Sequence, residues 1–261
     1  MHKNKKKLKV KISAVSYLNT LPFLYGIKNS DLKNEIDLAL DIPSDCAKKL
    51  LNNEVDLGLV PVAIIPQLKK HYIISDYCIG ADGKVDTVAL FSDVPLNEIE
   101  AIYLDFHSKT SINLVQVLAK EYWDIFPQFL DAKTGFEEKI QGTTAGVIIG
   151  DRTFNLPKAF KYKYDLSEEW KKMTGLPFVF ACWVANKKLP DSFIEQFNLA
   201  LKLGEENIDK VIDQSATISK DKLYHYLTQH ISYRLNKSKK EALALFINYL
   251  HKTQPVKVVV K

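Results

Sequence analysis

Short apolar runs alternate along the chain with longer segments in which apolar residues recur every three or four positions. The short runs are typical of strands, and the longer spacing is typical of helices. Strands are predicted at 9–13, 57–62, 85–92, 101–105, 145–151 and 177–185, and helices at 43–56, 108–123 and 167–175. From Pro190 to about His251 the pattern predicts three further helical segments, and residues 255–261 are predicted as a last strand or a tail. This alternation favours an α/β fold with mostly parallel sheets.

The order of the predicted elements indicates two lobes. The pattern restarts near Ile99 with a fresh strand and helix, and the C-terminal part is helical throughout. Because a helical segment of that size packs back onto an earlier lobe, the chain is expected to cross between lobes twice. Residues 1–90 and 184–261 are therefore assigned to the first lobe, and residues 91–183 to the second. The cleft between two such lobes is a common place for a small ligand.

Composition and charge narrow the class of protein. The 261 residues are 46% hydrophobic and 26% charged, which is ordinary for a globular chain with sizeable cores. Much of the net charge of +5 comes from lysines near the N-terminus, namely Lys3, Lys5, Lys6, Lys7, Lys9 and Lys11. We interpret this cluster as a solvated chain end and not as a nucleic-acid arm, because no interleaved aromatic and basic residues follow it.

Localisation is predicted from features that the sequence lacks. The basic start is not followed by an apolar stretch or a small-residue cleavage site, so no signal peptide is expected. No apolar run approaches the length of a membrane span. Cys46, Cys78 and Cys182 are odd in number and far apart, so they are predicted to be reduced and buried. These features favour a cytoplasmic protein with no membrane or nucleic-acid partner, and they leave its oligomeric state open.

Three polar clusters follow predicted strands, at the edge where α/β sheets bind ligands. The first is SYLNT at 16–20, the second is HSKTS at 107–111, and the third is Gly150 with Asp151. The second cluster begins a helix, and the free N–H groups and positive dipole end of a helix start favour an anion.

Each cluster has a structural and a functional interpretation. Ser108, Thr110 and Ser111 either bind an anion or supply only the N-cap of their helix. Asn19 can both donate and accept hydrogen bonds, and it either contacts a ligand or braces its own turn. Asp151 is an acid, a hydrogen-bond anchor or a helix cap.

Signatures of several enzyme classes are missing from the sequence. It contains neither G-x-x-x-x-G-K-S/T nor G-x-G-x-x-G, so nucleotide and dinucleotide motifs are absent. It has no G-x-S-x-G elbow, and no pair of histidines has metal-ligand spacing. His107 lies beside the second polar cluster, whereas the other histidines are predicted to have surface or packing roles. The prediction is a site with no metal and no cofactor.

Six segments together carry a family resemblance. They are AVSYLNTLPF, DLGLVPVA, IGADGKVDTVALFSDVP, SKTS, IIGD and YDLSEEWKKMTGLPFVFACW, and they span about residues 10–183. In this order and at these separations they resemble the chorismate dehydratase family, whose enzymes catalyse the first step of the futalosine route to menaquinone. The resemblance implies a fold similar to type II periplasmic binding proteins, with two α/β lobes and a central cleft.

The resemblance also implies an activity and a site. The activity is a lyase that removes water from chorismate, a dicarboxylate, to give 3-(1-carboxyvinyloxy)benzoate without metal or cofactor. Asn19 matches the asparagine of the family's L-N-T/C-x-P motif and is expected to lie over the substrate, where it would position the leaving hydroxyl or the enolpyruvyl group. Ser108, Thr110 and Ser111 match the family's S-R-T-S, and Thr87 matches a serine-type position. These four residues are expected to bind carboxylates.

Two further residues belong to the predicted site, and two depart from the family pattern. Ser16 is assigned to substrate binding and Asp151 to catalysis. Since no obvious general base stands at these positions, we hypothesise that the enolpyruvyl carboxylate of the substrate takes the proton.

Lys109 stands where arginine is usual in the family. Lysine keeps the positive charge but cannot make the two parallel hydrogen bonds of a guanidinium group. Asp86 stands where a basic residue often precedes Thr87, and strand alternation should point it away from the cleft.

Two other functions are weighed against this one. A dihydroxynaphthoate synthase of the same pathway shares the fold, but that family opens with S-P-C-P-N-D, which AVSYLNTLPF does not resemble. A non-enzymatic protein that binds a small anionic solute would need export or a membrane anchor, and the sequence predicts neither.

Overall fold

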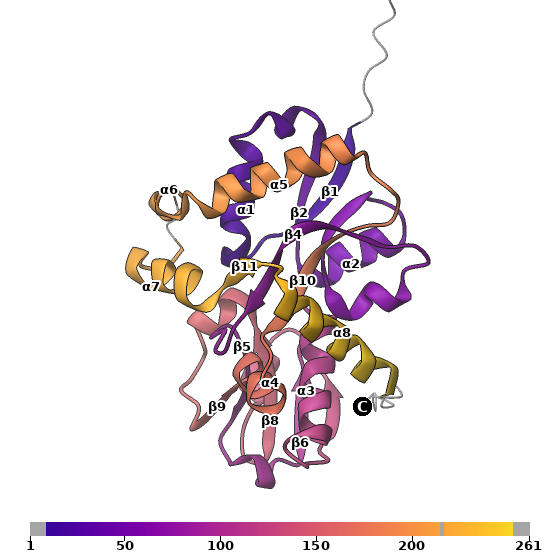
Figure 1. Cartoon of the computed structure of the whole chain (residues 1–261). Coiled ribbons are helices and arrows are strands. Elements are labelled where there is room, and N and C mark those ends of the chain that lie inside the picture. Colours follow the sequence, from indigo (N-terminus) through magenta and orange to yellow (C-terminus); the bar gives the residue numbers. More distant parts are fainter. Residues whose placement is uncertain (1–8, 215–216, 253–261) are drawn as a thin grey trace, which may run out of the picture.

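A computed structural model describes residues 9–214 and 217–252, which form two sheets, each covered by helices (Figure 1). The first sheet has the order β11-β4-β10-β3-β1-β2, and the second has the order β7-β6-β8-β5-β9. The strands of the first sheet are β1 (Val10–Val15), β2 (Ile36–Asp41), β3 (Leu57–Pro61), β4 (Tyr72–Ala81), β10 (Phe178–Ala185) and β11 (Ser232–Arg234). Those of the second are β5 (Val88–Ser92), β6 (Ala101–Leu104), β7 (Gln128–Asp131), β8 (Thr144–Ile149) and β9 (Tyr162–Asp165).

Both sheets are mixed, so the prediction of mostly parallel sheets is wrong. Strand β1 pairs in parallel with β2 and β3, and β6 pairs in parallel with β7 and β8. Strand β10 is antiparallel to β3 and β4, and β5 is antiparallel to β8 and β9. The reason is that β10 returns from the second lobe, so it enters the first sheet at the end where β3 leaves it.

The predicted lobe borders fall inside strands. Residues 90 and 91 lie within β5, and residues 183 and 184 lie within β10. Since each of these strands is hydrogen-bonded within a single sheet, a division by sheet places the crossings a few residues earlier. The chain leaves the first sheet through residues 82–87 and returns to it through residues 175–177.

Helices cover the faces of both sheets (Figure 1). They are α1 (Leu21–Lys28), α2 (Pro43–Leu51), α3 (Lys109–Glu121), α4 (Leu166–Thr174), α5 (Asp191–Glu205), α6 (Ile208–Asp213), α7 (Lys220–His225) and α8 (Lys237–Lys252). The C-terminal part is more broken than predicted, because a π-helical turn, η7 (Tyr226–His230), and strand β11 separate α7 from α8. Helix α8 packs on β10 and reaches α3 of the second lobe. Residues 255–261 lie outside the described residues.

Short 3-10 turns connect the strands to the helices around the cleft. They include η1 (Leu18–Thr20) after β1, η3 (Val62–Gln67) after β3 and η6 (Gly150–Phe154) after β8. The turns therefore lie at the carboxyl ends of parallel strands, where α/β proteins bind ligands.

One large apolar cluster holds the molecule together. It contains buried side chains of both sheets, such as Ile12 and Trp183 in the first and Leu90 and Val147 in the second. The predicted burial of Cys46, Cys78 and Cys182 is confirmed, and all three thiols are free. Because the cluster is continuous, the two lobes share a core as well as two chain crossings.

Helices α1 and α5 approach each other at two glycines. A Cβ atom added at Gly26 would lie 1.8 Å from the carbonyl oxygen of Ala200, and one added at Gly204 would lie 1.7 Å from that of Pro22. Both neighbours are backbone atoms, which cannot move aside without displacing a helix. The helix pair therefore requires a hydrogen atom at each position.

We expect Gly204→Ala to lower the free energy of unfolding by at least about 2 kcal/mol, because overpacking outweighs the better helix propensity of alanine. The control is Leu199→Ala on the same helix, where the side chain is 66% exposed. This control should change the free energy by less than about 0.5 kcal/mol. Urea denaturation followed by circular dichroism measures both, and a Gly204→Ala variant as stable as the parent would contradict the packing argument.

Candidate active site

A cavity lies where the ends of both sheets meet. Its empty volume is about 500 Å³, with the open solvent at its mouth included. The lining residues are Val15, Tyr17, Asn19, Pro43, Pro61, Ile79, Val85, Thr87, Val88, Ser108, Ser111, Ile149, Gly150, Phe180 and Ala181. The structure thus brings Asn19, Thr87, Ser108 and Ser111 together from three separate segments. Ser16, Thr110 and Asp151 are not among the lining residues.

The cavity offers hydroxyls and one carboxamide on apolar walls. Tyr17 is the one lining residue with a titratable side chain among the residues described. Burial raises the pKa of Tyr17, and nearby Asp105 raises it further, so the phenol stays protonated at neutral pH. The walls therefore present neutral hydrogen-bond donors and acceptors.

Ser108 and Ser111 lie at the start of α3. Ser108 is the N-cap, and its side-chain oxygen accepts a hydrogen bond from the N–H of Ser111 at 3.4 Å. The N-cap role of Ser108 is therefore confirmed, and because the same residue lines the cavity, anion binding stays a prediction. The first N–H groups of a helix lack intrahelical acceptors and favour an anion nearby. Lys109 is exposed and is not a lining residue.

Thr110 faces the first lobe and not the cavity. Its hydroxyl donates to the carbonyl oxygen of Phe180 at 3.0 Å and accepts from the N–H of Ala63 at 3.3 Å. The side chain is fully buried. Because both hydrogen bonds go to backbone groups of β10 and η3, Thr110 fastens α3 to the first lobe.

Asn19 is held by groups from distant parts of the chain. Its Nδ2 donates to the hydroxyl of Tyr226 at 3.3 Å, and its Oδ1 accepts from the hydroxyl of Thr20 at 3.2 Å. The hydroxyl of Tyr233 donates to the backbone carbonyl of Asn19 at 3.0 Å. Tyr226 Oη also lies 2.9 Å from Thr87 Oγ1. Neither tyrosine was predicted as a site residue, because neither belongs to a motif.

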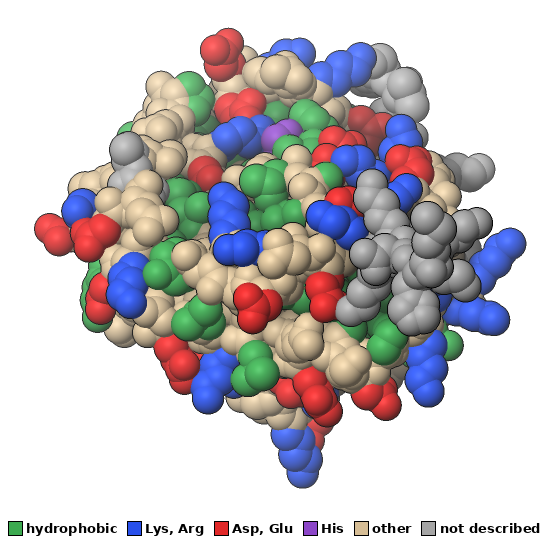
Figure 2. Space-filling model, turned by 90° about the horizontal axis from the view of Figure 1, so that it is seen from above, with side chains coloured by type: hydrophobic (Ala, Val, Ile, Leu, Met, Phe, Trp, Pro, Cys, Tyr) green, Lys and Arg blue, Asp and Glu red, His purple; other side chains and the backbone are tan. Residues whose placement is uncertain are grey.

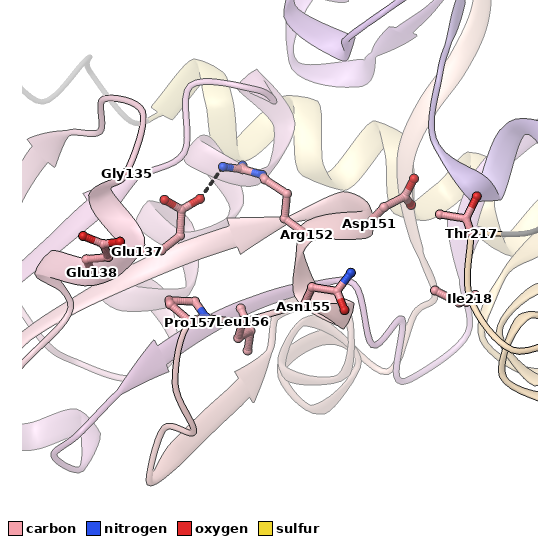
Figure 3. Close-up of a pocket in the computed structure, with 10 residues that line it drawn as sticks. All are labelled: Gly135, Glu137, Glu138, Asp151, Arg152, Asn155, Leu156, Pro157, Thr217 and Ile218. Carbon is pink, nitrogen blue, oxygen red and sulfur yellow. Dashed lines mark hydrogen bonds and ion pairs between the residues drawn. The ribbon is translucent and has the colours of Figure 1, made fainter.

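Asp151 anchors the turn that carries Asn19. Its two carboxylate oxygens accept from the N–H of Leu18 at 3.2 and 3.1 Å. Burial raises the pKa of Asp151 to about 6, although the bond from Leu18 opposes the shift. On its other side Asp151 opens onto a second cavity with Arg152 and Glu137 (Figure 3). Of the three predicted roles, the hydrogen-bond anchor matches these contacts.

Tyr17 connects the same turn to the second lobe. Its hydroxyl lies 2.7 Å from His107 Nδ1, and the two rings stack with centroids 6.5 Å apart. Gly150 lies against the tyrosine ring at φ 69°, where a Cβ atom would come within 2.7 Å of the ring. Ser16 is exposed, and its N–H donates to the carbonyl of Asp41 at 2.9 Å.

Asp105 organises the second-lobe side of the site. Its buried carboxylate accepts from the N–H groups of His107 at 3.0 Å and Ile149 at 3.1 Å, and it pairs with Arg152. Burial raises the pKa of Asp105 to about 6, and Arg152 opposes the shift. Burial also lowers the pKa of His107 to about 4, with Arg152 adding to the effect. The imidazole is therefore neutral at neutral pH.

Asp86 lies outside the cavity lining, paired with lysines. Its carboxylate lies 2.7 Å from Lys163 Nζ and 3.0 Å from Lys84 Nζ. Burial alone would raise the pKa of Asp86, but hydrogen bonds from the two lysines lower it to about 2. The residue precedes β5 at φ 68°, so a left-handed turn, and not strand alternation, sets its direction.

The surface carries charges of both signs. Figure 2 shows lysine and arginine side chains interspersed with aspartate and glutamate over the face seen from above.

Within 9–214 and 217–252, no three His, Cys, Asp or Glu side chains are grouped to hold a metal ion. No helix in the same ranges is both long and apolar enough to cross a membrane.

Comparison with known proteins gives the family. A family model described as menaquinone biosynthesis matches residues 10–252. The chain belongs to this family. The match covers both sheets and every residue that lines the cavity.

Two curated relatives of this chain are named chorismate dehydratase. The one from Campylobacter jejuni is 27% identical over 241 residues, which cover 89% of this chain and 94% of the relative. The one from Thermus thermophilus is 27% identical over 167 residues, or 57% of this chain. In that second alignment the chain spans 61% of the relative's length.

Solved structures show the fold of this family member. A protein from Archaeoglobus fulgidus superposes with a TM-score of 0.73 at 15% identity, over 94% of this chain and 97% of that one. A Candida albicans gene product, described as having the generic periplasmic binding protein fold, gives a TM-score of 0.60 at 14% identity, over 94% of each chain. The predicted two-lobe fold similar to periplasmic binding proteins is confirmed.

The lowered pKa of His107 predicts a pH dependence of stability. The folded pKa of about 4 lies below the ordinary value of 6.5, so only the unfolded chain takes up this proton as the pH falls between those values. The contribution of the neutral His107 side chain to the free energy of unfolding is therefore complete above pH 6.5 and is lost as the pH falls towards 4. Urea denaturation of the parent and of His107→Gln measures it.

We expect the stability advantage of the parent over His107→Gln to be smaller at pH 4.5 than at pH 7.5. Asp105 and Asp151 titrate in the same window, but both proteins contain them, so their contributions largely cancel in the difference. An advantage that is equal at the two pH values would show that the histidine is not desolvated in the folded protein.

Proposed function

We propose that the chain is a chorismate dehydratase, a hydro-lyase that converts chorismate to 3-(1-carboxyvinyloxy)benzoate and water. The observation that carries the proposal is the meeting of Asn19, Thr87, Ser108 and Ser111 in one cavity. The names of two relatives support the reaction, and the match to a menaquinone-biosynthesis family supports the pathway. The free, buried cysteines agree with a reducing compartment, and we propose the cytoplasm.

The cavity has donors for the two carboxylates of chorismate. Ser108, Ser111 and the first N–H groups of α3 form one group of donors, and Thr87 provides another from the crossing segment. Hydrogen bonds from such groups to a charged acceptor are worth about 1.5–3 kcal/mol each. Neutral donors are also dipoles fixed in place, which need no reorganisation as charge moves during the reaction.

The reaction depends more on how the protein positions the substrate than on an acid or base group of the protein. The hydrogen on ring carbon 3 leaves as a proton, and the hydroxyl on carbon 4 leaves with its bonding electrons. Together they make one water, and the ring becomes a benzene ring. Aromatisation supplies the driving force, so the protein has to bind the carboxylates, place the leaving hydroxyl and stabilise charge in the ring carboxylate. We assign the placement of the leaving hydroxyl to Asn19.

The surroundings of the cavity support the substrate as its own base. No carboxylate or imidazole is among the lining side chains of the described residues. Both oxygens of Asp151 are engaged by Leu18, and His107 Nδ1 is engaged by Tyr17. The enolpyruvyl carboxylate, attached next to the acidic hydrogen, is therefore the proposed proton acceptor.

The first test incubates the purified chain with chorismate, without added metal or cofactor, and analyses the mixture by chromatography with mass detection. We expect a product lighter by one water with an aromatic absorbance. If folded protein leaves chorismate unchanged, the lyase proposal fails. A rise in melting temperature with chorismate would then indicate a non-enzymatic anion-binding protein, which the fold also allows.

The second test separates the roles of Asn19 and Asp151. We expect Asn19→Ala to lower kcat by at least about a hundredfold, as removal of a transition-state hydrogen-bond donor does. Asp151→Asn keeps a polar side chain beside Leu18, and we expect it to act mainly on stability. Steady-state kinetics and thermal melting measure both variants.

The opposite pattern would assign the base differently. If Asn19→Ala keeps full activity while folded Asp151→Asn has none, the proton acceptor is the carboxylate of Asp151 and not that of the substrate.

A further inference from the structure

Two tyrosines from the C-terminal part of the chain contact Asn19, and Tyr226 contacts Thr87 as well. Tyr226 begins the π-helical turn η7, and its Oη lies 3.3 Å from Asn19 Nδ2 and 2.9 Å from Thr87 Oγ1. Tyr233 in β11 donates instead to the backbone carbonyl of Asn19. Tyr226 and Thr87 are both 1% exposed, so the bond between their hydroxyls is shielded from bulk water.

The direction of these hydrogen bonds follows from the hydrogens available. Asn19 Nδ2 can only donate, and Oδ1 of the same carboxamide already accepts from Thr20. The Tyr226 oxygen therefore accepts from Asn19 and keeps its own hydrogen to donate. Thr87 is its other partner among the described residues. Since a buried donor left without an acceptor is destabilising, Tyr226 donates to Thr87.

We propose that Tyr226 is a positioning residue that orders this chain of hydrogen bonds, from Asn19 through Tyr226 to Thr87, so that the Thr87 hydroxyl donates its own hydrogen into the cavity. The ligand atom beside Thr87 is therefore a hydrogen-bond acceptor, such as a carboxylate oxygen. The same contact orients Asn19, whose second Nδ2 hydrogen is left for the ligand. Only the identity of the ligand rests on the proposed function.

The position of Tyr226 is itself held by neighbouring contacts. His230, at the end of η7, lies with Nδ1 3.2 Å from the carbonyl oxygen of Lys84, in the segment that leads to Thr87. The ring of Phe154 packs edge-on against Tyr226, with centroids 5.4 Å apart. π-helical turns are often found at functional sites, and this one projects a single hydroxyl between two cavity-lining residues.

The test is a double-mutant cycle with Tyr226→Phe and Thr87→Val, read as kcat/KM for chorismate. Both changes remove a hydroxyl while nearly keeping the shape of the side chain. We expect Tyr226→Phe alone to lower kcat/KM about tenfold, with a raised KM, because the donor to the carboxylate is no longer ordered. In the Thr87→Val background the same change should cost less than it does in the parent, because the Thr87 hydroxyl is already gone and only the effect through Asn19 remains.

Tyr233→Phe is the matched control. It removes the same hydroxyl from a second buried tyrosine that hydrogen-bonds to Asn19 but not to Thr87. We expect its effect on kcat/KM to be the same in the parent and in the Thr87→Val background. If Tyr226→Phe is as additive with Thr87→Val as this control is, the proposal is overturned.

A second readout needs neither activity nor ligand. The side-chain amide signals of Asn19 in the nitrogen-15 NMR spectrum are identified by their loss in Asn19→Ala. We expect them to shift in ligand-free Thr87→Val, because the change reaches Asn19 through Tyr226, and unchanged signals would overturn the proposal. This readout decides the matter if Tyr226→Phe does not fold, or if the parent does not convert chorismate and the proposed function fails.

Discussion

The hydrogen bonds of one short turn, η1, determine the geometry of the whole site. The N–H of Leu18 is bound by Asp151 from the second lobe, and the carbonyl of Asn19 is bound by Tyr233 from the C-terminal part. At the residue just before the turn, the Tyr17 side chain contacts His107. A turn of three residues has almost no core of its own. Its conformation is therefore set from outside, and each lobe contributes to it.

The charges of the site lie behind its walls and not on them. Arg152 pairs with Asp105 and Glu137 in the second lobe, where it links the segments after β6 and β8. The lining itself is neutral among the described residues. A full charge on the wall would bind the substrate and the transition state about equally. Oriented dipoles can instead stabilise the particular atoms on which charge develops in the transition state. The arrangement suits a reaction in which negative charge moves across a ring and no charged group on the protein has to exchange a proton.

The sequence predicted those parts of the fold that have a local cause. Strands such as β3 and β8 are continuous apolar runs, and α3 has both a helical period and the N-cap Ser108. Helix α1, the turn η7 and the strands β2, β4, β7, β9 and β11 were not predicted. In the case of β11 the reason is that Ser232–Arg234 becomes a strand only by pairing with β4. Among the site residues, Asn19 and Thr87 were found through motifs. Tyr226 was missed because it is one of 12 tyrosines, and its partner Asn19 is 207 positions away.

The place of β10 in its sheet has a consequence for how the protein is made. Strand β10 lies between β3 and β4, so the first sheet has a gap until the ribosome has added Ala185. The strands of the second sheet, by contrast, form one unbroken stretch of sequence from Val88 to Asp165. During synthesis the later lobe can therefore complete its sheet first, while β3 and β4 still have unpaired edges. Such edges attract other chains, so the interval before β10 emerges is the part of synthesis most exposed to aggregation.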